Sequence, residues 1–304
     1  MRDAFISELT EAARVDPDVF LVVGDLGFSV IEEFQAEFPD RFLNAGVAEQ
    51  TMLGAASGLA AAGYKPFVYS IGNFPTMRAV EQIRNDVCYH DRHVTVVAVG
   101  GGFSYGYLGY THHALEDISV MRALPRMQVL SPSDPIEARA LTRFAVEAPG
   151  PKYLRLGKNR EPHLHDDALP VHGPCAIELF PGTDVALFVT GSIASVAIEA
   201  REELAKRGVS ARVVSVMRIK PLDDSIATVA HGIRGIVTVE EHSPVGGLGS
   251  AVLEFCAQSG LSIPTRIVGA SEAEIGRHIG STEYMRAKTG LGVSDIIAAA
   301  EGLL

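Results

Sequence analysis

The sequence predicts an α/β fold with two domains, each a mainly parallel β-sheet covered by helices. Short runs rich in valine and isoleucine alternate with amphipathic helical patterns along the chain, which is typical of parallel sheets buried on both faces. The length, 304 residues, exceeds that of one typical domain. The alternation stops between residues 159 and 182, where prolines, charges and histidines accumulate. We therefore expect a first domain over residues 1–165, a linker over 166–182 and a second domain over 183–304.

Each element is predicted from its local pattern. The N-terminal segment places apolar residues at helical spacing between charges, valine-rich runs indicate buried strands, and Pro75 marks the first turn of a helix. In the first domain, strands are expected at 19–24, 66–70, 93–99, 127–130 and 151–156, and helices at 50–62, 75–86, 115–124 and 134–147. In the second domain, strands are expected at 185–191, 211–216, 236–239 and 265–268, and helices at 192–207, 249–259 and 293–303.

Charge and cysteine content exclude several classes of protein. The formal net charge is −11, the acidic residues are dispersed, and no stripe of Lys and Arg is present, which argues against nucleic acid or an anionic membrane as a partner. Cys88, Cys175 and Cys256 show no paired spacing, so they indicate neither a disulfide framework nor a zinc site. The N-terminus lacks the pattern of a signal peptide, and we expect a cytoplasmic protein without a membrane segment.

The segment Asn44-Ala-Gly-Val-Ala-Glu-Gln50 places a single carboxylate, Glu49, at the start of a helix that is otherwise small and apolar. An anion there could simply complement the positive end of the helix dipole. The turns that follow contain alanine and glycine with no basic residue before Lys65, a composition suited to burial and close backbone contact. In such surroundings Glu49 could instead share a proton with a bound heterocycle. The spacing alone leaves both interpretations open.

Two further segments follow predicted strands. Ser70-Ile-Gly-Asn-Phe-Pro75 places Phe74 at the carboxyl end of a strand, where ligands of parallel sheets bind, so its ring could stack on a planar ligand or fill a strand–helix corner. Tyr110-Thr-His-His-Ala-Leu-Glu-Asp117 follows a glycine-rich loop. Its two histidines could act as acid–base groups near neutral pH, or the segment could cap the next helix.

Other chemically suggestive groups do not indicate a site. His90, His93 and the histidines and aspartates of 163–167 lie in polar connecting segments and are interpreted as solvated surface, so no metal ligand is assigned to this chain. The run 245–252 is similar to a dinucleotide fingerprint, but a valine at its third small position argues against NAD binding. The preceding Glu240-Glu-His242 is interpreted as shaping an interface or a cleft.

Taken together, these segments resemble the transketolase family of thiamine diphosphate enzymes. The order and spacing of the motifs match the family over residues 1–165, and the second half resembles the family's C-terminal domain. The resemblance implies a pyrimidine-binding domain followed by a transketolase C-terminal-like domain. The matching segments are 24–26, 41–50, 66–74, 111–117, 121–125, 218–223 and 239–249.

The resemblance implies a cofactor pocket on the first domain. Glu49 corresponds to the catalytic glutamate that contacts N1′ of the aminopyrimidine of thiamine diphosphate and exchanges a proton with it. Phe74 corresponds to the residue that stacks on the same ring, and Asp25, Leu26 and Ile71 would line the pocket. The family's Gly-Asp-Gly and following Asn, which bind Mg²⁺ and the diphosphate, do not occur. A separate N-terminal subunit would therefore supply the Mg²⁺ and diphosphate site, in an α₂β₂ assembly.

The resemblance also implies a substrate channel. His112 corresponds to a catalytic histidine that contacts the substrate, with His113 beside it, and Lys158 stands where the family usually has an arginine that binds the substrate phosphate. Two positions depart from the family. Leu108 replaces an aspartate that contacts the sugar hydroxyls, and the glycine run around Gly100 replaces a second phosphate-binding histidine. Loss of such polar groups changes substrate discrimination, so the usual pentose phosphate donors are in doubt.

The function implied is that of the C-terminal subunit of a split transketolase, which transfers a two-carbon ketol unit between ketose and aldose phosphates. A 2-oxo acid dehydrogenase β subunit and a deoxyxylulose-phosphate-synthase-like enzyme are the related alternatives. The histidine-containing string 111–122 favours a transketolase over the dehydrogenase. A non-catalytic scaffold subunit is an alternative of another class, and the intact Glu49, Phe74 and His112 argue against it.

Overall fold

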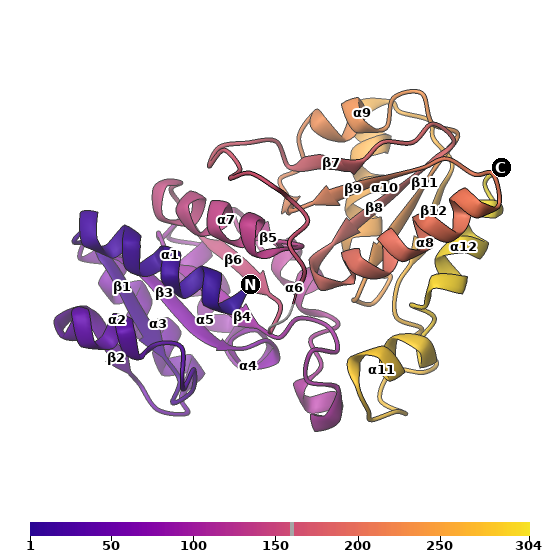
Figure 1. Ribbon diagram of the computed structural model, residues 1–304. Helices are drawn as coiled ribbons and strands as arrows, with labels where there is room; N and C mark the ends of the chain where they lie inside the picture. The colour runs from indigo at the N-terminus through magenta and orange to yellow at the C-terminus, as the bar shows by residue number, and fades with distance from the viewer. Residues whose placement is uncertain (159–160) are drawn as a thin grey trace.

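The computed structural model describes residues 1–158 and 161–304 and contains two β-sheets, each between layers of helices (Figure 1). Within these residues the first sheet has seven strands in the order β10-β5-β6-β4-β3-β1-β2. All neighbouring strands are parallel except β10 and β5. The strands are β1 (Val19–Val23), β2 (Phe42–Asn44), β3 (Lys65–Ile71), β4 (Thr95–Val99), β5 (Gln128–Leu130), β6 (Lys152–Leu156) and β10 (Arg218–Lys220).

Helices cover both faces of the first sheet. α1 (Arg2–Val15) and α7 (Pro135–Glu147) pack together on one face, and α3 (Glu49–Ala61) packs on the other. Because successive strand residues point to opposite faces, Leu21 of β1 joins the core with α1, and Val22 joins the core with α3. The shorter helical segments are α2 (Glu32–Glu37), α4 (Asn73–Met77), α5 (Val80–Gln82), a π-helical turn (Ile83–Cys88), α6 (Asp117–Ala123) and the 3₁₀ turns Pro39–Arg41, Gly106–Leu108 and Tyr110–His112.

The second sheet has five strands within the described residues, in the order β12-β11-β8-β9-β7, and β7 is the one antiparallel strand among them. One core lies against α8 and α12, and a second lies against α9 and α10. The strands are β7 (Ala176–Phe180), β8 (Val185–Thr190), β9 (Ala211–Val216), β11 (Gly235–Glu240) and β12 (Thr265–Val268). The helices are α8 (Ala194–Lys206), α9 (Ser225–Val229), α10 (Leu248–Ser259), α11 (Thr282–Lys288) and α12 (Val293–Glu301), with a 3₁₀ turn at Gly191–Ile193.

The predicted fold class is confirmed, whereas three short strands and the short helices α2, α9 and α11 were not predicted, and one expected helix is divided. The helix expected at 75–86 is divided into α4, α5 and the π-helical turn. β2, β7 and β10 were not predicted because a strand of a few residues at a sheet edge has no long apolar run, and its pairing depends on tertiary contacts. β7 lies inside the expected linker, and β10, from the expected second domain, completes the first sheet. The domain limits stay a prediction.

The two lobes of the molecule, one built on each sheet, share apolar contacts. Phe103 and Leu115, which come from segments after β4, are fully buried in the core formed by α8 and α12. α11 lies beside the loop around Gly106, whose carbonyl accepts a hydrogen bond from the Gly280 amide at 3.4 Å (Figure 1). In the described part of the chain, we find no helix with the length and apolar character needed to cross a membrane.

Candidate active site

The residues predicted to contact a cofactor lie along one edge of the first sheet. Asp25 follows β1, Ile71 is the last residue of β3, Phe74 lies in α4 directly after β3, and Glu49 is the first residue of α3. Parallel strands end at a common edge, so segments distant in the sequence meet there. Which of these residues bind a cofactor stays a prediction, and their geometry determines which chemistry is possible.

Glu49 and Phe74 are linked by a residue that the sequence analysis missed, Arg78. The Glu49 side chain is 4% exposed, and its Oε1 accepts a hydrogen bond from Arg78 Nη1 at 3.0 Å. The same guanidinium lies over the Phe74 ring, with Cζ 4.0 Å from the ring centroid. The spacing of Phe74 and Arg78 could have revealed this contact, because residues four apart share a helix face.

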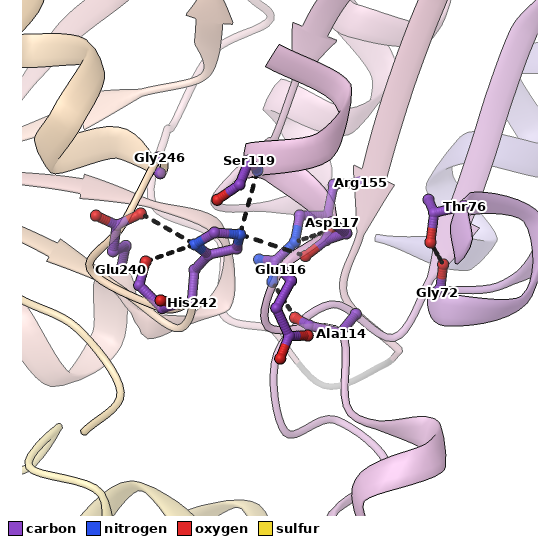
Figure 2. A network of polar contacts seen from close by, with 12 residues as sticks. Gly72, Thr76, Ala114, Glu116, Asp117, Ser119, Arg155, Glu240, His242 and Gly246 are labelled. Carbon is purple, nitrogen blue, oxygen red and sulfur yellow. Dashed lines mark hydrogen bonds and ion pairs between the residues drawn. The ribbon is translucent and has the colours of Figure 1, made fainter. Parts of the chain in front are cut away.

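His112 approaches the same ring from a different segment. Its imidazole meets Phe74 edge-on, with ring centroids 5.1 Å apart and an interplanar angle of 66°. Its Nδ1 lies 3.0 Å from the Thr111 hydroxyl. The two segments come close because Gly72 has no side chain, since an added Cβ would lie 2.9 Å from Ala114 Cβ. Figure 2 shows Gly72 accepting a hydrogen bond from the Thr76 hydroxyl at 3.0 Å, which holds the turn that carries Phe74.

His113 lies behind His112 and is fully buried. Its Nε2 lies 3.2 Å from the Gly106 carbonyl, and its backbone carbonyl accepts a hydrogen bond from Asn73. Burial lowers the pKa of His113, so the neutral ring donates from Nε2 to Gly106. In this arrangement His112 is the half-buried histidine beside Phe74, and His113 is the buried one that holds the loop in place.

Of the remaining predicted cofactor residues, Asp25 contacts Asn44. Asp25 has a positive φ of 55°, and its backbone amide donates to Asn44 Oδ1 at 3.0 Å. Asn44 returns a hydrogen bond to Asp25 Oδ1 at 3.2 Å. The Asp25 carboxylate is exposed and is oriented by this exchange. Leu26 and Ile71 are half-buried, and Leu26 packs against the core beneath α1.

A cavity of about 630 Å³ lies between the two lobes and is lined by Tyr105, Leu108 and Lys158, among other residues. The ammonium of Lys158 is 4.7 Å from the centroid of the Tyr105 ring. Gly100 has a φ of +85°, and an added Cβ would lie 2.0 Å from Tyr105 Cε2. The tyrosine ring therefore occupies the space that a side chain at position 100 would need. The packing of the Tyr105 ring therefore explains why residue 100 is a glycine.

We expect Gly100→Ala to reduce the free energy of unfolding by about 1–3 kcal/mol, because the methyl group overlaps the Tyr105 ring and the backbone is left-handed. Chemical denaturation followed by circular dichroism measures this change. Gly208→Ala is the matched control, since Gly208 has a φ of +81° with open space around it. Equal losses in the two variants would show that the tyrosine ring does not restrict position 100.

A buried polar network joins the two lobes behind the His112 loop (Figure 2). Arg155 of β6 donates to Asp117 of α6 at 2.8 Å, to the Ala114 carbonyl at 2.8 Å and to the Glu241 carbonyl at 3.0 Å. The side chain of Arg155 is 4% exposed and that of Asp117 is fully buried. Because Glu241 follows β11 of the second sheet, one guanidinium connects both lobes to the segment that carries His112.

Glu240, Glu241 and His242 each contact a different element. Glu240 accepts hydrogen bonds from the first amides of α10, and Glu241 accepts one from Phe103 and forms an ion pair with Arg286 at 2.5 Å. His242 accepts a hydrogen bond from the Ser119 amide at 3.4 Å (Figure 2). Their expected role in shaping an interface agrees with these contacts.

Burial controls the charge of this network. It lowers the pKa of His242 to about 4, which fits a neutral ring whose Nδ1 donates to the Ser243 carbonyl at 2.7 Å. It raises the pKa of Glu240 to about 7 against the opposing effect of the α10 amides. Burial also disfavours the ionised form of Asp117, but the Arg155 guanidinium together with His242 and the Tyr153 hydroxyl outweighs it, and the pKa of Asp117 lies below its usual value. Asp117 and Arg155 therefore form a charged pair.

The sheet edge fits a planar heterocycle that carries polar nitrogens. Glu49 provides a carboxylate and Phe74 provides an aromatic ring, and both contact the guanidinium of Arg78. Two buried polar atoms near Phe74 in the sequence, Ser70 Oγ of β3 and Asn73 Oδ1 of α4, have no hydrogen-bond partner among the described residues. The aminopyrimidine of thiamine diphosphate has the matching shape and nitrogen donors.

Among the described residues, the group of metal-capable side chains that lie close enough to share an ion is not at this edge. It lies at the start of α7 and consists of Asp134, Glu137 and His165. These side chains bind one another and nearby backbone: Asp134 accepts from the Glu137 and Leu164 amides, and His165 contacts Glu137 at 2.9 Å. The interpretation of His165 as solvated surface is wrong, because its side chain is 10% exposed and anchors the segment after residue 160.

Comparison with protein-family models agrees with the motifs. The model of the transketolase pyrimidine-binding domain matches residues 1–162, and the model of the transketolase C-terminal domain matches residues 176–296. The chain belongs to the transketolase family. The predicted resemblance is thereby confirmed over nearly the whole chain. The family is one of thiamine diphosphate enzymes, which agrees with the chemistry that Glu49 and Phe74 offer.

Relatives of similar length are subunits of split transketolases. The chain is 37% identical to one subunit of the apulose-4-phosphate transketolase of Phocaeicola vulgatus, over 90% of this chain and 88% of that protein. It is 34% identical to a 6-deoxy-6-sulfo-D-fructose transketolase subunit of Clostridium sp. strain MSTE9, over 99% of this chain and 93% of that protein. A solved structure described as a split gene transketolase, inactive beta4 tetramer, is 35% identical, with a TM-score of 0.90 and coverage of 100% and 97%.

Longer enzymes are also related. The 1-deoxy-D-xylulose-5-phosphate synthase of Desulforudis audaxviator is 32% identical over 98% of this chain, which spans 47% of that enzyme. The chain therefore corresponds to about half of the longer enzymes and to nearly all of a split transketolase subunit.

Proposed function

We propose that this transketolase family member supplies the aminopyrimidine half of a thiamine diphosphate site in a two-subunit transketolase. The observation that supports this most is the convergence of Glu49, Phe74 and His112 at one strand edge. The enzyme would transfer a two-carbon ketol unit from a ketose to an aldose. Thiamine diphosphate, when bound, supplies the electron sink that this carbon–carbon chemistry needs.

Each residue of the edge has a distinct task in this proposal. The Glu49 carboxylate holds and exchanges a proton at N1′ of the aminopyrimidine, and Phe74 fixes the plane of that ring by stacking. The half-buried His112 ring, beside Phe74, donates to or accepts from the hydroxyl of the substrate nearest the cofactor. Asp25, Leu26 and Ile71 close the pocket. Proximity and orientation are the main contributions of the protein.

Lys158 binds the anionic end of the substrate in this proposal. It lines the cavity between the lobes, and its side chain lies against Tyr105 instead of forming an ion pair with a described residue. Leu108, which is 55% exposed and lines the same cavity, removes the carboxylate that other family members use to contact sugar hydroxyls. Two relatives act on an apulose phosphate and a sulfonated fructose by name, so we infer an anionic ketose donor outside the usual pentose phosphates.

The proposal requires a partner subunit that binds Mg²⁺ and the diphosphate. The sequence lacks the family's Gly-Asp-Gly motif, and the described residues place no metal-capable cluster at the cofactor edge. The face of α3 that carries Gly54 and Gly58 has open space around it, which leaves room for a partner to approach the backbone closely. A relative that forms a tetramer of this type of chain alone is described as inactive. We infer an α₂β₂ complex.

Calorimetric titration with thiamine diphosphate and Mg²⁺ tests this proposal. We expect weak or no binding to the chain alone and binding at least about a hundredfold tighter in the complex with its partner. The reason is that each subunit alone provides only part of the contacts to the cofactor. Tight binding to the lone chain would contradict the division of the site. No binding in either sample would favour a scaffold subunit.

The alternatives within the enzyme class differ in substrate. Turnover of pyruvate without a ketose donor would favour a 2-oxo acid dehydrogenase β subunit. Condensation of pyruvate with an aldose phosphate would favour a deoxyxylulose-phosphate-synthase-like activity. The similarity to the longer synthase is the observation that supports this alternative. Ketol transfer from a sugar donor is the result that we expect.

A further inference from the structure

Arg78 occupies an unusual position between the two residues proposed to hold the aminopyrimidine. Its Nη1 donates to Glu49 Oε1 at 3.0 Å, and its Cζ lies 4.0 Å from the centroid of the Phe74 ring. A guanidinium is planar, and it can donate in its plane while it stacks through its face. One side chain therefore restrains a carboxylate on α3 and a ring on α4, which come from different segments of the chain, and Arg78 itself lies 29 residues from Glu49.

The contact with Arg78 occupies only part of the Glu49 carboxylate and of the Phe74 ring, so the rest of each group is available to a ligand. Arg78 uses Oε1 of Glu49, while Oε2 has no hydrogen-bond partner among the described residues. A phenyl ring has two faces, and the guanidinium lies over one of them, while the His112 ring is inclined to the phenyl ring by 66° with the ring centroids 5.1 Å apart. A ligand ring that accepts stacking on the second face and hydrogen bonds with Oε2 would meet both groups in fixed positions.

We propose that Arg78 is a positioning residue of the cofactor site, which orients the Glu49 carboxylate and the Phe74 ring toward the aminopyrimidine. This inference rests on the proposed function. Without the guanidinium, the Glu49 side chain would sample several rotamers, and fixing them again on binding costs affinity. Proton exchange at N1′ is sensitive to such misplacement, because small errors in geometry reduce rates strongly.

The alternative is a surface ion pair of little consequence. The Arg78 side chain is 48% exposed, and exposed ion pairs contribute little to folding stability. The same exposure makes the proposal testable, since replacement of Arg78 should leave the fold intact. An ion pair without a positioning role would not change cofactor affinity or the pH dependence of turnover.

The test uses the complete complex with its partner subunit. In calorimetric titration with thiamine diphosphate and Mg²⁺, we expect Arg78→Gln to weaken binding by roughly tenfold, as expected for the loss of a positioned side chain. Arg78→Lys keeps the charge but loses the planar stacking, so it should recover only part of the affinity. Arg84→Gln is the matched control, because the exposed Arg84 lies in the π-helical turn Ile83–Cys88 and its side chain donates a hydrogen bond only to its neighbour Asn85 among the described residues.

Two further measurements show whether Arg78 acts through Glu49. In a Glu49→Gln background, the effect of Arg78→Gln on affinity should be smaller than in the wild type. The pH profile of kcat should shift in Arg78→Gln and not in Arg84→Gln. If the wild-type complex does not bind the cofactor, the proposed function fails together with this inference. If the wild-type complex binds and Arg78→Gln binds equally well or more tightly, this inference alone is overturned.

Discussion

Replacing Glu49 with glutamine should reduce kcat of the assembled enzyme by about 10²–10⁴-fold, the range for loss of a positioned acid–base group. Glutamine keeps the size of the side chain and its hydrogen bonding, but it cannot hold or release the proton at N1′. Steady-state assays with excess thiamine diphosphate, Mg²⁺ and a ketose donor measure this change.

The control is Glu32→Gln, because Glu32 also begins a helix and lies on the exposed surface outside the site. It should keep normal turnover. The Glu49→Gln complex should also keep its thermal unfolding temperature, which separates a chemical effect from a structural one. Near-normal turnover in Glu49→Gln would show that the proposed role of this carboxylate is wrong.

Replacing Arg155 with methionine should lower the free energy of unfolding by about 3–5 kcal/mol, the cost of breaking a buried ion pair from one side. Methionine has a similar length, but it leaves the fully buried Asp117 without its cation and removes the Arg155 donor from the Ala114 and Glu241 carbonyls, of which Ala114 keeps only the Gly102 amide. Urea denaturation of the full chain, followed by circular dichroism, measures the change.

Arg207→Met is the matched control, because the Arg207–Glu301 pair lies on the surface with side chains 53% and 43% exposed. Its removal should change the free energy of unfolding by less than about 1 kcal/mol. Similar losses in both variants would mean that the buried network contributes no more than a surface ion pair. We also expect Arg155→Met to reduce turnover, since Ala114 follows the two histidines of the substrate loop.

The network around Arg155 gives the second lobe a physical role. Glu240, Glu241 and His242 end one strand of the second sheet, and their contacts reach α10, the glycine-rich loop and α6. The second lobe therefore holds the segment that carries His112 from behind, although none of the predicted site residues come from that lobe. The sequence indicated an interface at this position without indicating its partners.

Much of the candidate site could be predicted because its residues lie in local patterns. Glu49 at a helix start and Phe74 after a short apolar strand were recognised from segments of a few residues each, and the structure places both at the same edge. His112 was recognised with His113 as a pair, and only packing distinguishes them: one ring faces Phe74, and the other is buried against Gly106. Adjacent identical residues give no signal of which one points inward.

Periodicity within short segments predicted the alternation of strands and helices, and the motifs that resemble the transketolase family predicted the family and the residue types at the strand edge. Which of these groups meet depends on tertiary contacts. Arg78 pairs with Glu49 across 29 residues, and Arg155 bonds to the Glu241 carbonyl across 86. A buried charge or carbonyl needs a hydrogen-bond partner, and the fold brings that partner from a distant part of the chain. A local sequence pattern therefore does not predict which residue the partner is. The short edge strands β7 and β10 also depend on tertiary contacts, because each forms a strand by pairing with its neighbour in the sheet.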